Sequence, residues 1–211
     1  MSADLKSAVE KLERRAFTTY LARLKAYERL ARRNNAWNAS LIALATSTTI
    51  SAVGLLADRD MYGSGGDGLM VALAILSLVA SLVVSSVNYG SRSRAMEAGY
   101  KRIQQISISA EGFFVSHLAP TSERFVDLQK EYGVAVEFSE NHTRADHIRA
   151  NRDTAKGNPA PAEGALSRAA RADGRRIILV DNLITLAPYA TLSIPIALLI
   201  PFVSWFAGGF H

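Results

Sequence analysis

The chain has 211 residues, of which 49% are hydrophobic and 20% charged, with a formal net charge of +5 and no cysteine. The absence of cysteine excludes a disulfide framework and any thiolate metal site. The charges lie between three long apolar blocks. This segregation is typical of a membrane protein, and it accounts for the basic balance without direct nucleic-acid binding.

Residues 1–35 predict an amphipathic cytoplasmic helix. An apolar stripe with steps of three and four runs from Leu5 to Ala31. We expect the stripe to pack against other cytoplasmic helices, with Tyr20 and Tyr27 on Tyr100; a helix lying on the membrane surface is the alternative. No Gly or Pro precedes Trp37, so the helix should continue into the next segment. Four basic residues lie off the stripe: Arg14, Arg15, Arg29 and Arg32.

Residues 36–89 predict a transmembrane hairpin with spans at 36–57 and 68–89. Each run would be a helix about 33 Å long, which is enough to cross the hydrocarbon core of a bilayer. The second run holds no charge and should insert unaided. The first contains seven Ser, Thr and Asn residues and would be marginal alone in lipid. This asymmetry indicates that the hairpin assembles into something larger.

Each span carries a row of small or polar residues at helical spacing. The first-span row is Ser40, Ser47 and Ser51, and the second-span row is Ser77, Ser81, Ser85 and Asn88. Small residues let helices approach closely, and hydroxyls can bond across the contact. Two interpretations stay open: the rows mediate helix packing, or one row lines a pore in an oligomer. Neither row holds an ionisable residue, so nothing resembles a proton relay or a charged selectivity ring.

The charges around the hairpin predict its orientation. Basic residues gather before the first span and after the second, whereas the turn has three aspartates against Arg59 alone. By the positive-inside rule the N-terminus should be cytoplasmic and the tip, at residues 62–66, external. The basic flanks should also contact anionic lipid in the bilayer.

Residues 90–152 predict a cytoplasmic helical region. The helix of the second span should continue below the membrane until Pro120 ends it. A further helix is expected from Thr121 or Ser122, as its cap, to Tyr132, with Gly133 as its stop.

A polar cluster follows at Glu140, Asn141, His142 and Asp146. His142 and Asp146 are four residues apart, so they share one face of a helix. Metal ligation or acid–base chemistry is conceivable there, yet no recognised ligand spacing appears. We therefore expect a structural or regulatory cluster, with no catalytic residue, metal or cofactor.

The C-terminal part divides into a linker and a third apolar segment. Residues 153–182 are rich in Ala, Gly and Pro and predict a linker. Residues 183–211 are free of charged residues and contain Pro188, Pro195 and Pro201, which predicts a kinked third span. Arg175 and Arg176 should keep its near end cytoplasmic and its C-terminus external. A re-entrant or interfacial segment is the alternative.

The fold class predicted from these elements is an all-α membrane protein: a two-span hairpin with cytoplasmic helical extensions and a Pro-kinked third C-terminal span. This order resembles the SLATT domain family, the two-transmembrane effector domains associated with SMODS and SLOG proteins. Two stretches carry the resemblance: Tyr89-Gly90-Ser91-Arg92-Ser93-Arg94-Ala95, and Ser139-Glu140-Asn141-His142…Asp146-His147. The latter stretch is similar to the Asn-His…Asp signature of the fifth subgroup, in which an aromatic often stands where this chain has His147.

The resemblance implies an effector of a bacterial anti-phage system in the inner membrane. It implies a homo-oligomer that forms a pore or disrupts the membrane, so that growth stops or the cell dies. A cytoplasmic partner of the nucleotidyltransferase or reverse-transcriptase type would supply the signal.

Two other functions follow from the residues alone. One is a non-conducting membrane anchor that tethers a cytoplasmic partner. The other is an enzyme centred on Glu140, His142, Asp146 and His147. We expect no enzyme, because the sequence has no nucleophile motif, metal signature or phosphate-binding glycine loop.

Overall fold

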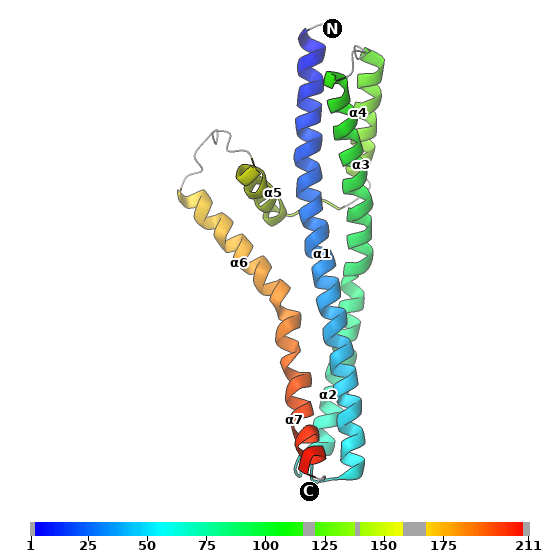
Figure 1. Ribbon diagram of the computed structural model, residues 1–211, viewed down its shortest axis with the longest axis vertical. Coiled ribbons are helices and arrows are strands. Elements are labelled where there is room, and N and C mark those ends of the chain that lie inside the picture. The colour runs from blue at the N-terminus through cyan, green and yellow to red at the C-terminus, as the bar shows by residue number, and fades with distance from the viewer. Residues whose placement is uncertain (1–2, 116–120, 138–139, 158–167, 209–211) are drawn as a thin grey trace. The chain divides into compact units, whose positions relative to one another are not determined.

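The computed structural model of the chain describes residues 3–115, 121–137, 140–157 and 168–208. Every regular element in these ranges is an α-helix (Figure 1). The helices are α1 (Ala3–Ala57), α2 (Gly66–Val87), α3 (Tyr89–Val115), α4 (Ser122–Glu137), α5 (Arg144–Gly157), α6 (Arg168–Thr191) and α7 (Ser193–Gly208). Helices α5 and α6 cover parts of the segment expected as a linker, whose residues 158–167 lie outside the described ranges.

The chain divides into two compact units. The extramembrane unit comprises Met1–Ala31 and Gly90–Asp181, and the membrane unit comprises Arg32–Tyr89 and Asn182–His211. Three helical stretches are long and apolar enough to cross a membrane: Asp4–Ala57, Gly66–Phe114 and Asp173–Gly208. The predicted fold class, an all-α membrane protein with a two-span hairpin and a third C-terminal span, is confirmed.

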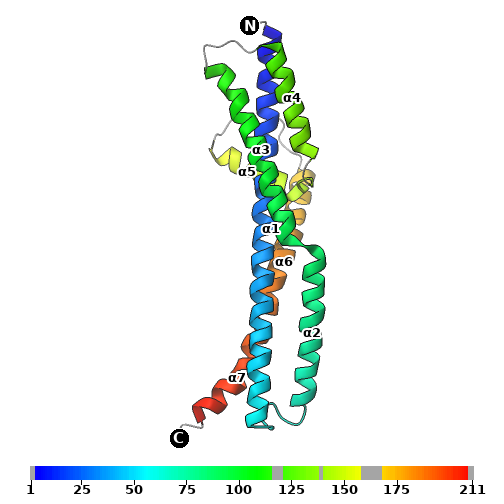
Figure 2. The ribbon, with the colours of Figure 1, turned by 90° about the vertical axis from the view of Figure 1, so that its right-hand side faces the viewer.

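The core of the extramembrane unit lies between α1, α3 and α4, which run side by side (Figure 2). The apolar stripe of α1 contributes Leu12 and Ala16, α3 contributes Ile103 and Ile106, and α4 contributes Leu128. The stripe therefore packs inside the protein, as expected, with Leu12 and Ala16 buried. The expected tyrosine contact is confirmed: the Tyr100 ring centroid lies 6.2 Å from that of Tyr20 and 5.5 Å from that of Tyr27.

Helix α4 begins as predicted but ends later. The Thr121 hydroxyl accepts a hydrogen bond from the Arg124 amide at 3.3 Å, so Thr121 is the N-cap. The helix does not stop at Gly133, and that prediction is wrong: α4 continues to Glu137. Ala135, in this last turn, is buried in the three-helix core, and its packing outweighs the cost of a glycine inside the helix.

In the membrane unit, α1 and α2 form the hairpin. The intervening turn is closed by Asp58, whose carboxylate accepts a hydrogen bond from the Asp60 amide at 2.9 Å. Gly63 has φ +71, a left-handed conformation that costs glycine little. At the other end of α2, Asn88 adopts the left-handed conformation, with φ 51 and ψ 46, and separates α2 from α3. The predicted continuation into a second helical part is therefore present, but with a joint at Asn88.

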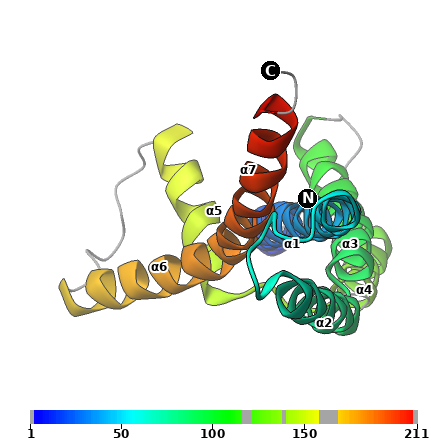
Figure 3. The ribbon, with the colours of Figure 1, turned by 90° about the horizontal axis from the view of Figure 1, so that it is seen from below.

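The third segment is kinked between α6 and α7, at Leu192. Pro195 has no amide to donate, and its ring crowds the carbonyl four residues earlier. The Leu192 amide accordingly donates to Tyr189 three residues back, at 3.2 Å, instead of continuing the α-helical pattern. Helices α2 and α7 lie on different sides of the C-terminal half of α1 (Figures 2 and 3).

Candidate functional site

The Asn-His…Asp stretch forms the N-terminal end of α5. The Thr143 hydroxyl accepts from the Asp146 amide at 3.4 Å, while Asp146 Oδ2 accepts from the Thr143 amide at 3.0 Å and from its hydroxyl at 2.7 Å. This reciprocal pattern is a capping box, in which an aspartate takes the usual place of glutamate. The local sequence therefore explains why α5 begins at Arg144.

The same carboxylate pairs with Arg29 of α1. Arg29 Nε donates to Asp146 Oδ1 at 3.0 Å, and Arg29 Nη2 donates to Oδ2 at 2.9 Å. The Asp146 side chain is fully buried, and that of Arg29 is 7% exposed. Burial by itself would raise the pKa of Asp146, but the hydrogen bonds from Arg29 and Thr143 outweigh it and hold the pKa below the ordinary value. Arg29 lies off the apolar stripe, as predicted, yet it is buried beneath α5.

Two further ion pairs join α5 and α6 within the extramembrane unit. Arg149 Nη1 lies 2.7 Å from Asp181 Oδ2 and 3.8 Å from Asp146 Oδ1. Arg144 pairs with Asp173 at 2.9 Å on the exposed side. The buried pair is thus extended by Arg149 into a network that links α1, α5 and α6.

Arg23, two helical turns before Arg29, holds the C-terminal end of α4. Its Nη1 donates to the Ala135 carbonyl at 2.9 Å and its Nη2 to the Val136 carbonyl at 2.7 Å. These carbonyls have no partner within α4, and a cation there also complements the helix dipole. Burial lowers the pKa of Arg23 from its ordinary value. Two buried arginines of α1 therefore fix the end of one helix and the start of the next.

The two histidines of the cluster stack on each other. The His142 and His147 rings lie 5.9 Å apart at 25°. Burial, His147 and Arg23 lower the pKa of His142, so the neutral imidazole is favoured. Among the described residues no three side chains are grouped to hold a metal ion. That the chain binds no metal and is not an enzyme stays a prediction.

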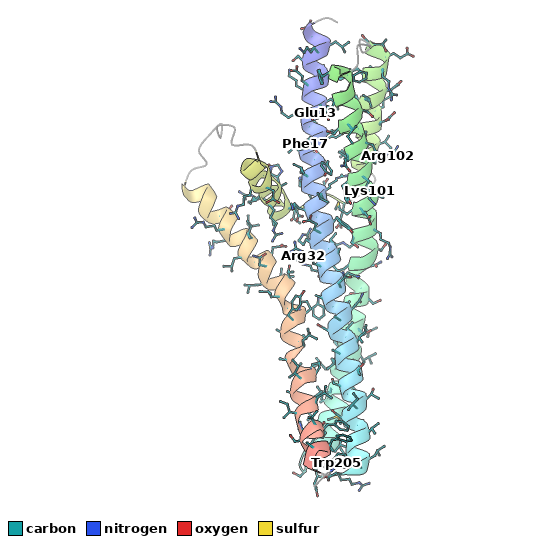
Figure 4. The ribbon with its side chains drawn as sticks, in the orientation of Figure 1. Glu13, Phe17, Arg32, Lys101, Arg102 and Trp205 are labelled. Atoms are coloured by element: carbon teal, nitrogen blue, oxygen red, sulfur yellow. The ribbon has the colours of Figure 1, made fainter. Side chains whose placement is uncertain are left out.

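The remaining residues of the predicted cluster lie at the surface. Glu140 accepts two hydrogen bonds from Arg92 of α3, each 3.0 Å long. Asn141 is exposed. Figure 4 shows Lys101 and Arg102 projecting from the same helix, α3, where both are exposed. The sequence pattern indicated the acidic members of these pairs but not their basic partners, Arg29 and Arg92, which are distant in the chain.

The first-span row faces the third segment in the membrane unit. Ser40 donates to the Pro188 carbonyl of α6 at 2.5 Å, and Ser51 donates to the Leu198 carbonyl of α7 at 3.4 Å. Ser47 is 1% exposed and donates to the Leu44 carbonyl in its own helix. All three serines of the first-span row are buried, and Ser40 and Ser51 bond to the C-terminal helices.

The second-span row lies on a different surface. Ser77 is partly buried, whereas Ser81, Ser85 and Asn88 are exposed. In the most apolar part of this helical stretch only 6% of the residues are buried within the chain. The structure thus does not bring the two rows together, and the pore-lining or packing role of each stays a prediction.

A family model, SMODS and SLOG-associating 2TM effector domain family 5, matches residues 5–207. The chain belongs to this family. The resemblance to the fifth SLATT subgroup is confirmed, and it identifies the protein as a membrane effector domain. Comparison with curated proteins and with solved structures finds no match.

The extent of the SLATT match bears on the third segment. The family description refers to two transmembrane spans, but the match continues through α6 and α7 to residue 207. The helices that cover the first-span row are therefore part of the family's domain. The match also includes Arg23, Arg29 and Asp146, which join the helices of the extramembrane unit.

Proposed function

We propose that this SLATT protein is an effector that oligomerises in the bacterial inner membrane and permeabilises it when a partner signals infection. The observation that carries the proposal is the exposure of α2, including its serine side chains. The most apolar part of this helical stretch is only 6% buried within the chain, yet the helix exposes Ser81 and Ser85. Hydroxyls in hydrocarbon favour a partner helix or water over lipid. A second copy of the chain packed on α2 would supply the partner helix, and a pore would supply the water.

The second-span row provides a direct test in cells. Ser77→Leu combined with Ser81→Leu removes two hydroxyls and fills the space that a close helix contact needs. We expect inducible expression of wild type with its neighbouring gene to depolarise the membrane, measured with a potential-sensitive dye, and the double variant to lose this effect. Ser86→Leu is the matched control, because its hydroxyl is satisfied by the Val83 carbonyl of its own helix, at 2.8 Å. Depolarisation that survives the double change would exclude this row as the pore.

The proposed signal enters through the extramembrane unit. Its helices are joined by the buried Arg29–Asp146 ion pair and by hydrogen bonds from Arg23 to the carbonyls of α4, so the unit has a defined surface to present to a partner. The family description names SMODS and SLOG association. By the family resemblance, the partner is a signal-generating enzyme of the nucleotidyltransferase or reverse-transcriptase type. Depolarisation that depends on the neighbouring gene is the expected result.

The alternative is a membrane anchor that tethers its partner without conducting. The observation that favours it is the size of the extramembrane unit, which has its own three-helix core. The dye experiment separates the two functions. An anchor never depolarises the cell, with or without the neighbouring gene, but its partner is recovered in the membrane fraction only when the anchor is present.

A further inference from the structure

The third segment is fastened to α1 by hydroxyl groups. Pro188 O accepts hydrogen bonds from Ser40 at 2.5 Å and from Thr191 at 2.6 Å. Tyr62, in the hairpin turn, places its Oη 2.7 Å from the carbonyl oxygen of Leu198 and 2.7 Å from the hydroxyl oxygen of Ser51. Each of these carbonyls belongs to α6 or α7, and each contacts the first-span row or the turn beside it.

The kink explains why the Pro188 carbonyl is available. In a regular helix the Pro188 carbonyl would accept the Leu192 amide, but that amide bonds to Tyr189. A carbonyl released in this way must find another donor in a membrane. Ser40 and Thr191 provide it. The carbonyl released at the kink and the Ser40 hydroxyl of the first-span row therefore satisfy each other.

Beside Gly54, three residues after Ser51, the space next to α1 is filled by Phe202 of α7 and by Met61. A Cβ added at Gly54 would lie 3.0 Å from Phe202 Cδ2 and 2.8 Å from Met61 Sδ. Leu198 packs beside it, in a cluster with Leu55 and Met70. No other helix fits against this face of α1 while α7 lies there.

We propose that α6 and α7 form an intramolecular clamp that covers the first-span row in the resting protein, and that activation displaces it. The inference rests on the proposed function and describes the effector before it is activated. Departure of the third segment uncovers Ser40, Ser47 and Ser51, the polar face of the marginally apolar span. Those hydroxyls then meet water in a pore or a second copy of the chain. The clamp thereby keeps the first span stable in lipid until the signal arrives.

A disulfide across the clamp tests the need for displacement. The chain has no cysteine, so Gly54→Cys with Phe202→Cys gives one unambiguous bond. We expect the oxidised full-length variant not to depolarise cells, and reduction to restore depolarisation. The matched controls are the single variants Gly54→Cys and Phe202→Cys, neither of which can form the bond within one chain. Both should depolarise in both redox states. Equal depolarisation by the oxidised and reduced clamp variant would overturn the proposal.

A further readout does not depend on conduction. Ser47→Cys is a suitable reporter, because the Ser47 hydroxyl bonds only within α1 and the position is 1% exposed. In the resting protein it should resist a water-soluble maleimide and form no disulfide between copies. Adding Gly54→Leu should displace α7 and produce labelling or the disulfide, whereas adding Gly68→Leu, which meets nothing within 4 Å, should not.

The two readouts separate the clamp from the proposed function. If Gly54→Leu changes neither labelling nor disulfide formation at Ser47→Cys, the third segment is not a clamp. If it changes them while no variant depolarises cells, the clamp stands and the permeabilising function fails. With both correct, Gly54→Leu depolarises cells without the neighbouring gene.

Discussion

At the scale of single residues, Asp146 links the start of α5 to α1 within the extramembrane unit. Its carboxylate caps α5 through Thr143 and neutralises Arg29, which is buried in α1. A buried ion pair is weak evidence for net stability, but removing one partner leaves an uncompensated charge. The burial of the pair, more than its charge, decides the consequence of a substitution.

We therefore expect Asp146→Asn to lower the free energy of unfolding by about 3 kcal/mol, because the Arg29 charge stays buried without its counterion. Glu140→Gln is the control: it breaks an exposed pair with Arg92 and should cost at most about 1 kcal/mol. Denaturant unfolding of the purified protein, followed by circular dichroism, measures both. Similar losses in the two variants would contradict the structural role of the buried pair.

His142 gives the unit a pH dependence. Folding lowers its pKa through burial, His147 and Arg23, with Asp146 opposing, so the unfolded chain binds the proton more tightly. This contribution to stability is complete above the unfolded value of 6.5 and decreases as pH falls from there toward the folded pKa. The melting temperature of the wild type should thus fall as the pH is lowered from neutral to 5. The melting temperature of His142→Gln should fall less over the same range. Parallel pH profiles for the two proteins would refute the assignment.

At the scale of elements, Asn88 is the joint between α2 and α3 and also belongs to the second-span row. It is the one residue other than glycine with positive φ among those described. Asn tolerates this conformation better than residues with larger or branched side chains. Its backbone role and its predicted polar role can therefore be separated by substitution.

Asn88→Gly tolerates the left-handed backbone but removes the side-chain amide. Asn88→Ala removes the side-chain amide and also tolerates the left-handed backbone less well. We expect Asn88→Gly to retain the wild-type melting temperature and depolarising activity. Asn88→Ala should lose roughly 1 kcal/mol of stability, the cost of the left-handed conformation for a residue with a Cβ. Thermal unfolding in detergent and the dye measurement check the pair. Loss of activity in Asn88→Gly, with stability intact, would instead assign a polar role to the side chain.

The elements show where the sequence is informative. Apolar runs and the stripe of α1 predict the helices, because both follow from local periodicity. Local periodicity does not predict the partners of Arg23 and Arg29, since these partners lie 112 and 117 residues away in the chain. The predicted end of α4 is wrong for a related reason: burial of Ala135 against distant helices outweighs the local tendency of Gly133 to end a helix. The second-span row was visible as a pattern, but the covering of the first-span row by a third segment was not.

At the scale of the whole molecule, the distribution of charge and the candidate membrane spans predict the topology. Basic residues flank the outer ends of the hairpin, which predicts that its tip is external. The apolar length of α6 and α7 predicts a third crossing, with the C-terminus on the same side as the tip. Trp205 lies near the end of α7 (Figure 4), in the position where tryptophan favours the interface between lipid and water.

Single cysteines test this topology, since the natural chain has none. Ser64→Cys in the turn and Gly208→Cys at the end of α7 should react with an impermeant maleimide added to intact spheroplasts, because both sites are exposed and are predicted to be external. Ser122→Cys, at the start of α4, should react only after permeabilisation, because the predicted topology puts it on the cytoplasmic side. If Gly208→Cys behaves like Ser122→Cys while Ser64→Cys is labelled from outside, the third segment is re-entrant. If all three patterns invert, the basic flanks do not set the orientation.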